Sequence, residues 1–157
     1  MGLKDSAQRV QDQLLALGYT NVVVELPDST RTALEAAEAI GCEVAQIAKS
    51  IIFRLQRADS PLLVVASGIN RVNQQTVSNH VIDALGKADA EFVRQRTGFV
   101  IGGVPPLGHT EAIATIIDED LLPFETIWAA AGHPKAVFQL TPTQLVDMTQ
   151  GHVMAIK

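Results

Sequence analysis

The sequence predicts an α/β domain with one mixed β-sheet, partly antiparallel and barrel-like, flanked by helices. The chain has 157 residues, of which 47% are hydrophobic and only 4% aromatic, so aliphatic side chains must form its core. Apolar residues at helical spacing are interleaved with β-branched runs of strand length. Several of these runs follow one another with only turns between them, which favours a mixed sheet over a regular βαβ series. We expect a single domain over residues 1–157, because no repeat, low-complexity segment or linker divides them.

Two helices and one strand are expected in the first forty residues. Gly18 and Gly41 each follow an apolar pattern of helical spacing, and each would end its helix. Thr32 with Glu35 matches a capping box, and residues 29–30 offer an alternative cap one turn earlier. The expected elements are a helix over residues 5–17, a strand over residues 21–26 and a helix from Thr32 to Ile40.

The middle of the chain predicts a hairpin followed by helices. Residues 43–48 are expected to add one or two helical turns, and residues 58–61 to connect two strands. Asn73 can cap the next helix, whose apolar positions continue to Leu85 and which Gly86 would end. The expected elements are strands over residues 50–56 and 62–67, a helix over residues 73–85 and a short helix around Phe92 and Val93.

The last third of the chain predicts four strands and one helix. Thr141 and Gln144 match a capping box with Pro142 at the first helical position, which is a strong helix start. The acidic residues 118–120 are expected to form a solvated turn. The expected elements are strands over residues 112–117, 126–130 and 136–140, a helix from Thr141, and a strand over residues 152–156.

Composition excludes several classes of function. A net charge of −5 argues against a broad electrostatic surface for nucleic acid, although a few local phosphate contacts stay open. The single Cys42 excludes an internal disulfide and fits a reducing compartment. No apolar run reaches membrane-spanning length and the amino end has no signal-peptide pattern, so we expect a cytoplasmic protein without a membrane segment.

The densest motif is residues 101–109, with three glycines and two adjacent prolines. Glycines add backbone entropy that folding must remove, and prolines offset part of that cost by fixing φ. A tight turn is the simpler interpretation, but it needs only about two to five residues. Gly102 and Gly103 leave main-chain N–H groups accessible to a polar ligand, so we interpret the segment as a binding loop. The other candidate substrate-binding residues in it are Val104, Pro105, Pro106, Gly108 and His109.

Lys49 is the second candidate for chemistry. It is predicted at the junction between residues 43–48 and the strand over residues 50–56, in an otherwise apolar context. A lysine at a strand start is equally compatible with a simple exposed position. If the strand is buried on both faces, however, this ammonium needs a ligand anion or a carboxylate, because an unpaired buried charge is costly. Together with the N–H groups of Gly102 and Gly103, Lys49 could form an anion-stabilising pocket of the oxyanion-hole kind.

Most motifs that would indicate a metal site, a cofactor or a serine nucleophile are absent from the sequence. No pair of the four histidines has the spacing of a metal site, so we expect no metal. Gly-x-Ser-x-Gly, the Walker pattern and Gly-x-Gly-x-x-Gly are absent, and we expect no cofactor. His133 follows small residues and could line a pocket, although a hydrogen-bonded turn histidine is the simpler interpretation for it and for His109. His80 is expected at the surface, and His152 has no obvious partner.

Lys49-Ser50 and the glycine–proline loop together resemble the YbaK/ProX family, the editing-domain relatives of bacterial prolyl-tRNA synthetase. The matching segments are residues 32–54, 97–109 and 127–134, in the family's order and spread over nearly the whole chain. The lysine segment alone is a weak signal, but the Gly-x-x-x-Pro pattern of residues 102–106 makes the combination specific.

The resemblance implies the YbaK/ProRS-associated domain fold and a freestanding trans-editing deacylase that hydrolyses the ester bond of a mischarged aminoacyl-tRNA. It implies that Lys49 is essential and that Gly102, Gly103 and Pro106 contact the aminoacyl end and the terminal adenosine. It also implies attack by water, helped by the substrate's own ribose hydroxyl and without a metal. Ser50 is neither the asparagine of the alanine-specific branch nor the threonine common in the cysteinyl-specific branch, so the resemblance does not name the amino acid.

Two other functions stay open from the sequence. One is a non-catalytic module that binds tRNA ends or a synthetase, and the other is a small-molecule esterase. For the deacylase and for the tRNA-binding module alike, a synthetase partner could raise the local concentration of the tRNA. The oligomeric state is not indicated by any pattern.

Overall fold

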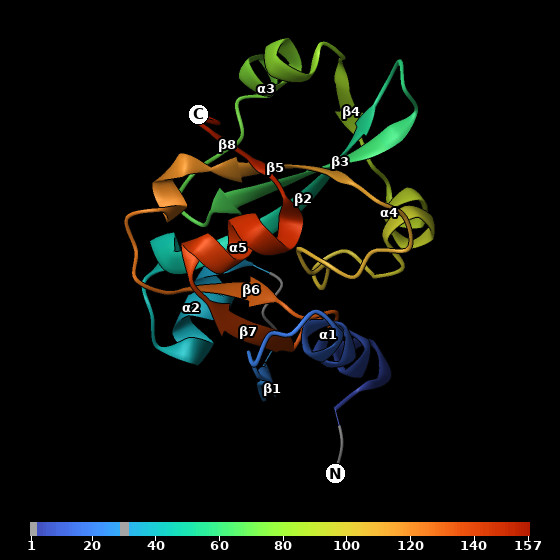
Figure 1. Cartoon of the computed structure of the whole chain (residues 1–157). Helices are drawn as coiled ribbons and strands as arrows, with labels where there is room; N and C mark the ends of the chain where they lie inside the picture. Colours follow the sequence, from blue (N-terminus) through green and yellow to red (C-terminus); the bar gives the residue numbers. More distant parts are fainter. Residues whose placement is uncertain (1–2, 29–31) are drawn as a thin grey trace.

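In the computed structural model, eight strands form one mixed sheet within residues 3–28 and 32–157, the part of the chain that the structure describes (Figure 1). The hydrogen-bonded order is β1-β7-β6-β2-β3-β5-β8, and β4 pairs with β2. The expected mixed sheet is confirmed, and because this path ends at β1 and β8 it is open, not a closed barrel. The strands are β1 (Val23–Glu25), β2 (Ile47–Leu55), β3 (Ser60–Ser67), β4 (Leu85–Lys87), β5 (Ala114–Asp118), β6 (Ile127–Ala130), β7 (Ala136–Leu140) and β8 (His152–Met154).

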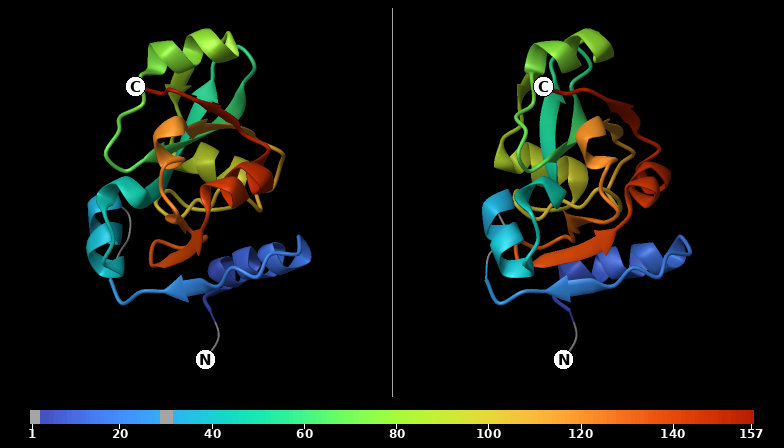
Figure 2. Two further views of the ribbon diagram at one scale, coloured as in Figure 1. Left: turned by 60° about the vertical axis from the view of Figure 1, so that its left-hand side comes forward. Right: turned by 90° about the vertical axis from the view of Figure 1, so that its left-hand side faces the viewer.

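Helices surround this sheet, and α1 and α3 lie at opposite ends of the molecule (Figure 1 and Figure 2). None of the described helices is both long and apolar enough to cross a membrane. The helices are α1 (Asp5–Ala16), α2 (Ala33–Ile40), α3 (Gln74–Val81), α4 (Ala90–Thr97) and α5 (Pro142–Thr149), with 3₁₀ turns η1 (Val44–Gln46) and η2 (Glu119–Leu121).

The central strand β3 is buried on both faces and contributes to two of the three clusters of buried hydrophobic residues in the described chain. Leu63 and Val65 belong to the larger cluster, to which α1, α4 and α5 contribute. Leu62, Val64 and Ala66 belong to a second cluster with α3. Successive side chains of a strand point to opposite faces, so one strand serves both clusters. Each fully buried valine or leucine stabilises the fold by about 1.5–3 kcal/mol.

The helix starts expected from the sequence are confirmed for the described residues. Thr32 caps α2 in a capping box with Glu35, whereas the alternative cap at residues 29–30 lies outside the described residues. Asn73 caps α3, and Thr141 caps α5 with Pro142 at its start. Each side-chain oxygen accepts a main-chain N–H that the helix itself leaves unpaired, which is worth about 1 kcal/mol.

Two expected helix boundaries are wrong, because the residues there form strand hydrogen bonds with segments far along the chain. Residues 43–48 form only the 3₁₀ turn η1, because Ile47 and Ala48 already pair with β6 as the first residues of β2. The helix expected to reach Leu85 ends at Val81, and residues 85–87 instead form β4 against β2. Tertiary hydrogen bonding of the backbone here overrides the local apolar spacing.

The turn between α3 and β4 is held by Asp83. Its carboxylate accepts the main-chain N–H groups of Arg57 and Ala58 at 2.9 Å each, at the tip of the β2–β3 hairpin. These two hydrogen bonds lower the pKa of Asp83 below its ordinary value. The carboxylate therefore ties the chain back onto the hairpin and starts β4 where the sequence pattern predicted more helix.

Candidate active site

The outer edge of β2 contains a gap in strand pairing. β6 pairs with β2 only at residues 47–48, and β4 pairs with it only at residues 53–55. Lys49 to Ile52 therefore have no strand partner on this edge within the described residues, although β3 covers their other edge. The segment around Gly102 lies opposite this gap, because Gly102 and Val104 line the same two hollows as Lys49 and Ser50.

Two hollows meet at these four residues. The first has a volume of about 480 Å³, including space open to solvent, and most of its other lining residues are small or aliphatic. The second has a volume of about 1230 Å³ on the same basis and extends along Ile51 and Ile52 toward α4. Among the further lining residues of the first hollow are Ala33, Ala36, Trp128, Ala129 and Val137.

Lys49 supplies the positive charge at this junction. It is the third residue of β2, paired with Ala66, and is not at the junction before the strand as the sequence suggested. Its side chain is half-buried, and its Nζ donates one long hydrogen bond of 3.5 Å to the carbonyl oxygen of Asn70. No described carboxylate forms an ion pair with it. A partly desolvated ammonium without a counterion is suited to an anionic or strongly polar ligand.

A buried polar network holds Asn70 under Lys49. The Asn70 side-chain amide donates to Asp118 and to Asp120, each at 2.8 Å, and Asp118 also accepts the main-chain N–H of Ser67 at 2.9 Å. Asp118 is 1% exposed, so the expectation of a solvated acidic turn is wrong for Asp118, although Glu119 is exposed in the turn η2. Its carboxylate instead satisfies buried donors at the carboxyl ends of β3 and β5, which run parallel. Sequence reasoning missed the roles of Asn70 and Asp118. The available signal was that Asp118 is an acidic residue directly after the apolar run expected to form a strand over residues 112–117.

The glycine pair has two different roles. Residues 100–103 form a turn closed by the Gly103 N–H, which donates to the Val100 carbonyl at 3.0 Å. Gly102 has φ +89° at the third position of this turn, as a type II turn requires. The Gly102 N–H donates no hydrogen bond to any described residue. Of the two N–H groups that the sequence offered as donors, only that of Gly102 is uncommitted, and Gly103 lines neither hollow.

Gly103 lacks a side chain for a packing reason. A Cβ atom at this position would lie 2.9 Å from the carbonyl carbon and 3.0 Å from the Cα of His133. The loop and the turn before β7 are also joined by the Gly132 N–H, which donates to the Gly103 carbonyl at 2.8 Å. The expectation that this glycine admits a ligand is therefore replaced by close contact between two backbone segments.

We expect Gly103→Ala to destabilise the protein by about 1–3 kcal/mol, because backbone must shift to admit the new methyl group. Urea unfolding measures this difference. Gly86→Ala is the matched control, since the nearest contacts of its Cβ are looser, at 3.2 Å. Equal free energies of unfolding for Gly103→Ala and the wild type would contradict the packing role.

Ser50 places an unsatisfied hydroxyl next to Lys49. Its Oγ is buried and has no hydrogen-bond partner among the described residues. Such an unpaired group is costly unless a ligand or water supplies a partner. Val104 is buried and lines both hollows, whereas Pro105 is buried and lines neither.

His109, Pro106 and Gly108 do not share the pocket of Lys49. They line another hollow, which α1 and α5 also border. His109 Nε2 lies 2.7 Å from the Pro105 carbonyl oxygen, so this nitrogen carries the proton and donates. His109 thus supports the loop from the side away from Lys49, and burial lowers the pKa of its imidazole.

The buried His109 predicts a dependence of stability on pH. Between the lowered pKa of the folded state and the ordinary value, the unfolded chain binds more protons, so the free energy of unfolding falls as the pH falls through this interval. We expect His109→Gln, which cannot titrate, to lose less stability than the wild type between pH 7 and pH 5. Urea unfolding at both pH values tests this, and identical losses in the two proteins would contradict it.

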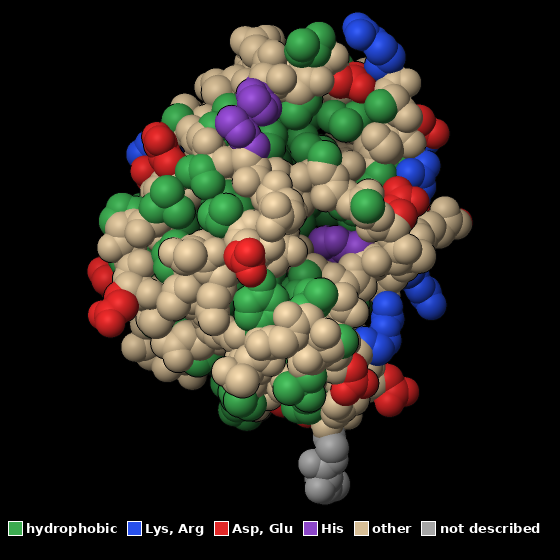
Figure 3. Space-filling model, in the orientation of Figure 1, with side chains coloured by type: hydrophobic (Ala, Val, Ile, Leu, Met, Phe, Trp, Pro, Cys, Tyr) green, Lys and Arg blue, Asp and Glu red, His purple; other side chains and the backbone are tan. Residues whose placement is uncertain are grey.

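The other histidines lie outside the two hollows. His133 Nδ1 accepts the main-chain N–H of Lys135 at 3.1 Å, so His133 is a turn histidine whose backbone contacts Gly103. His80 is exposed as expected. His152 does have a partner, because its ring stacks on that of His80 with centroids 4.3 Å apart. In Figure 3, histidine side chains lie together on the surface near α3 and β8. Within residues 3–28 and 32–157, no three His, Cys, Asp or Glu side chains are grouped to hold a metal.

Comparison with known proteins identifies relatives in sequence and in fold. Residues 27–148 match the family model described as the aminoacyl-tRNA editing domain. The chain is 31% identical to "Uncharacterized protein YwhH" of Bacillus subtilis (strain 168) over 144 residues, 92% of this chain and 91% of that protein. It is 24% identical to "Putative Cys-tRNA(Pro)/Cys-tRNA(Cys) deacylase EbsC" of Enterococcus faecalis (strain ATCC 700802 / V583), over 76% of this chain and 73% of that protein. A solved structure, "Crystal structure of a putative trans-editing enzyme for prolyl tRNA synthetase", is similar with a TM-score of 0.94 and 44% identity over 99% of each chain.

Proposed function

The chain belongs to the aminoacyl-tRNA editing domain family, and from that premise we propose that it is a trans-editing deacylase that hydrolyses the ester bond of mischarged tRNA. The observation that carries the proposal is the pairing of two uncommitted groups at one pocket. The Lys49 ammonium has no described counterion, and the Gly102 N–H has no described acceptor. An ester carbonyl needs such donors when its oxygen becomes negatively charged.

The proposed reaction uses water as the nucleophile. Water adds to the ester carbonyl carbon and gives up one proton, with the neighbouring ribose hydroxyl of the substrate assisting the transfer. The Gly102 N–H and the Lys49 ammonium stabilise the resulting oxyanion. The carbon–oxygen bond to the ribose then breaks, the ribose oxygen takes up the proton, and the amino acid and the tRNA leave.

The two hollows suggest how the substrate is divided. Most side chains that bound the first hollow are small or aliphatic, and Lys49 is the only charged one among the described residues that line it, so it suits a short uncharged amino-acid side chain. The second opens from the same junction and suits the terminal adenosine. Ser50 lines both hollows and its buried hydroxyl has no described hydrogen-bond partner, so we propose it as the hydrogen-bonding contact to the aminoacyl group.

The decisive experiment is a panel of tRNAs charged with single labelled amino acids and incubated with the purified protein. We expect ester loss well above the spontaneous rate for at least one mischarged tRNA and no loss for the correctly charged prolyl-tRNA. Binding of the tRNA end without ester loss anywhere on the panel would overturn the enzymatic proposal and favour a binding module. Turnover of simple esters that is insensitive to added tRNA would favour an esterase.

A further inference from the structure

The main chain of β2 has uncommitted hydrogen-bonding groups along the gap between β6 and β4. In a strand, the N–H and C=O groups of successive residues point alternately to the two edges. The Ile47 carbonyl oxygen accepts a hydrogen bond on the β3 side, and the Gln56 N–H donates one on the β4 side. Because the register with β3 is continuous over residues 48–55, residues 50 and 52 point like Gln56 to the outer edge. Ser50 and Ile52 therefore direct their N–H and C=O groups into the gap.

No hydrogen bond within the described residues satisfies these main-chain groups. β6 pairs with β2 before this segment and β4 pairs with it after. The loop around Gly102 forms no main-chain hydrogen bond with Ser50 or Ile52, and the second hollow lies along both residues instead. An unpaired strand edge of this kind is a template for an added extended chain, and residues 49–52 span about 13 Å.

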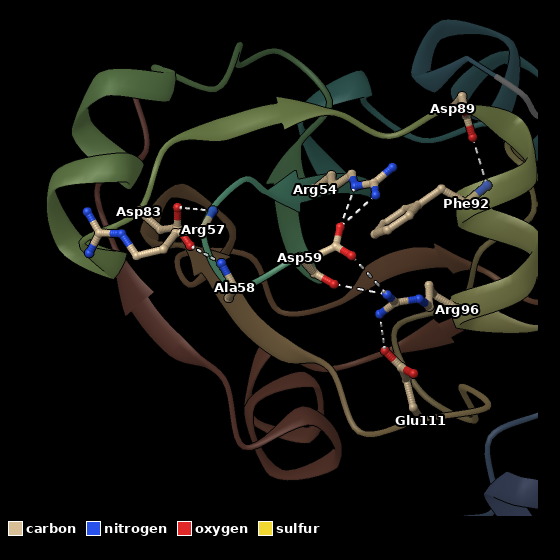
Figure 4. A network of polar contacts seen from close by, with 9 residues as sticks. All are labelled: Arg54, Arg57, Ala58, Asp59, Asp83, Asp89, Phe92, Arg96 and Glu111. Atoms are coloured by element: carbon tan, nitrogen blue, oxygen red, sulfur yellow. Dashed lines mark hydrogen bonds and ion pairs between the residues drawn. The ribbon is translucent and has the colours of Figure 1, made fainter.

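A network around α4 keeps this gap open. Asp89 caps α4 soon after the end of β4 by accepting the Phe92 N–H at 2.8 Å, so the chain leaves the edge of β2 there. Arg54 and Arg96 both lie over the ring of Phe92 (Figure 4). Both also form ion pairs with Asp59 at the β2–β3 hairpin. Because α4 is held on the hairpin in this way, β4 does not continue along β2, and the gap is a fixed feature of the fold.

The charges around the two hollows favour an uncharged nitrogen in the ligand. Lys49 is the only charged residue among the described residues that line them. The α-ammonium of a free amino-acid ester would lie near this like charge and find no carboxylate, which is unfavourable. An acylated α-nitrogen carries no charge but keeps an N–H group. That N–H can donate to the uncommitted carbonyl oxygen of Ser50.

We propose that the site also accepts esters of N-acylated and peptidyl amino acids, with the peptide lying antiparallel to β2 along this edge. The proposal rests on the proposed function, which places the ester carbonyl at Lys49 and the Gly102 N–H. From there the peptide extends toward Ile52, and the nucleoside lies across the same hollow against the exposed Val100 and Ile101. The reaction is the same hydrolysis. Water adds to the ester carbonyl, the bond to the ribose oxygen breaks, that oxygen takes up the proton, and a peptide with a free carboxylate leaves.

Strand pairing determines which groups of the peptide meet Ser50 and Ile52. Residues of an antiparallel pair exchange both hydrogen bonds at every second position. With the esterified amino acid opposite Ser50, its N–H donates to the Ser50 carbonyl oxygen. The acyl carbonyl on that nitrogen faces away from β2, and the next carbonyl along the peptide accepts the Ile52 N–H. An N-acetyl dipeptide therefore gains a hydrogen bond that an N-acetyl amino acid lacks.

The test compares N-acetyl dipeptidyl and N-acetyl aminoacyl esters of adenosine, built on the amino acid that the tRNA panel identifies. In the wild type we expect a KM about fivefold lower for the dipeptidyl ester, the usual worth of one hydrogen bond. Ile52→Pro removes the N–H that faces the gap and leaves the ladder with β3 intact, so the two KM values should become equal. Ile52→Ala, the matched control, shortens the same side chain but keeps the N–H and the fivefold difference. A difference that persists in Ile52→Pro would overturn the proposal.

Changes in the substrate alone provide a second test on the wild-type protein. Acetylation of the α-nitrogen should raise kcat/KM at pH 6, where the free amino-acid ester carries an ammonium. An equal or lower value would overturn the proposal. Methylation of the same nitrogen in the N-acetyl ester removes its N–H, and KM should then rise about fivefold. An unchanged KM would exclude the hydrogen bond to the Ser50 carbonyl and with it the assigned register.

A binding measurement keeps the inference distinct from the proposed function. If the wild type hydrolyses no charged tRNA and no ester of the series, the proposed function fails. Fluorescence anisotropy of a fluorescein-acylated tetraalanine with a free carboxylate still measures binding at the β2 edge. This peptide is expected to bind the wild type and Ile52→Ala about fivefold more tightly than Ile52→Pro, and equal binding to all three would overturn the strand-addition site. If the panel shows deacylation but acetylation of the α-nitrogen abolishes it, the proposed function stands and this inference fails.

Discussion

Lys49→Ala is expected to slow ester hydrolysis about 100- to 1,000-fold, the usual loss when one donor of an oxyanion site is removed. The effect should fall on kcat, because the charge on the carbonyl oxygen develops only on the way to the transition state. Single-turnover hydrolysis of the mischarged tRNA, with the enzyme in excess, measures this step directly.

The fold of the Lys49→Ala variant is expected to survive. The ammonium forms no ion pair with a described residue, so its removal leaves no carboxylate buried without a partner. The substitution removes the hydrogen bond from Nζ to the Asn70 carbonyl oxygen, which at 3.5 Å is long and therefore weak. Circular dichroism and urea unfolding should therefore match the wild type closely.

Matched variants separate the charge from the size of this side chain. Lys49→Met keeps the apolar stem and should be as slow as Lys49→Ala, whereas Lys49→Arg keeps the charge and should retain part of the activity. Arg57→Ala, a cation at the hairpin tip, controls for net charge. A folded Lys49→Met protein that hydrolyses at the wild-type rate would exclude the assigned role.

Local signals in the sequence predicted the starts of the helices well. The caps at Thr32, Asn73 and Thr141 and the left-handed Gly41 depend on residues within one helical turn, so the sequence contains the whole cause. Part of the candidate pocket was also predicted from local composition, because glycines, whose backbone entropy is costly to remove, and prolines are concentrated around Gly102. Sequence reasoning failed where the cause lies far along the chain.

Gly103 and β2 illustrate this limit. The reason for glycine at position 103 is the backbone of His133, and no pattern around Gly103 reports that contact. The gap at Lys49 exists because β6 leaves the edge of β2 before β4 joins it, which is a property of two pairings made by distant segments. The resemblance joined Lys49 to the loop, but only the pairing explains why the pocket opens there.

Asp118→Ala is expected to cause the largest loss of stability, about 2–5 kcal/mol, because each buried donor left without an acceptor costs about 1–3 kcal/mol. The change removes the acceptor of the Ser67 and Asp120 N–H groups and one of the two hydrogen bonds of the Asn70 side-chain amide, which keeps its contact with Asp120. Ser67 and Asn70 are themselves buried, so water cannot replace the carboxylate without opening the carboxyl ends of β3 and β5. The midpoint of urea unfolding measures the loss.

Asp120→Ala separates burial from hydrogen bonding in this network. Asp120 accepts from the same Asn70 amide at 2.8 Å, but its side chain is 37% exposed and its second partner is the exposed Lys157. Water can therefore solvate what Asp120→Ala leaves behind, and we expect a much smaller loss of stability than for Asp118→Ala. Similar losses of unfolding free energy for Asp118→Ala and Asp120→Ala would show that burial does not determine the contribution of Asp118 to stability.

The same substitutions connect stability to the pocket. The backbone carbonyl of Asn70 accepts the hydrogen bond from Lys49, and the carboxylate of Asp118 accepts one from the Asn70 side chain. Asp118 therefore influences the position of the Lys49 ammonium through Asn70. At a temperature where Asp118→Asn remains folded, kcat for deacylation should fall while KM stays near the wild-type value, because the ammonium is displaced from the carbonyl oxygen rather than removed. Asp120→Ala, which leaves the Asp118 contacts in place, should keep kcat, and an equal fall in both variants would detach Lys49 from this network.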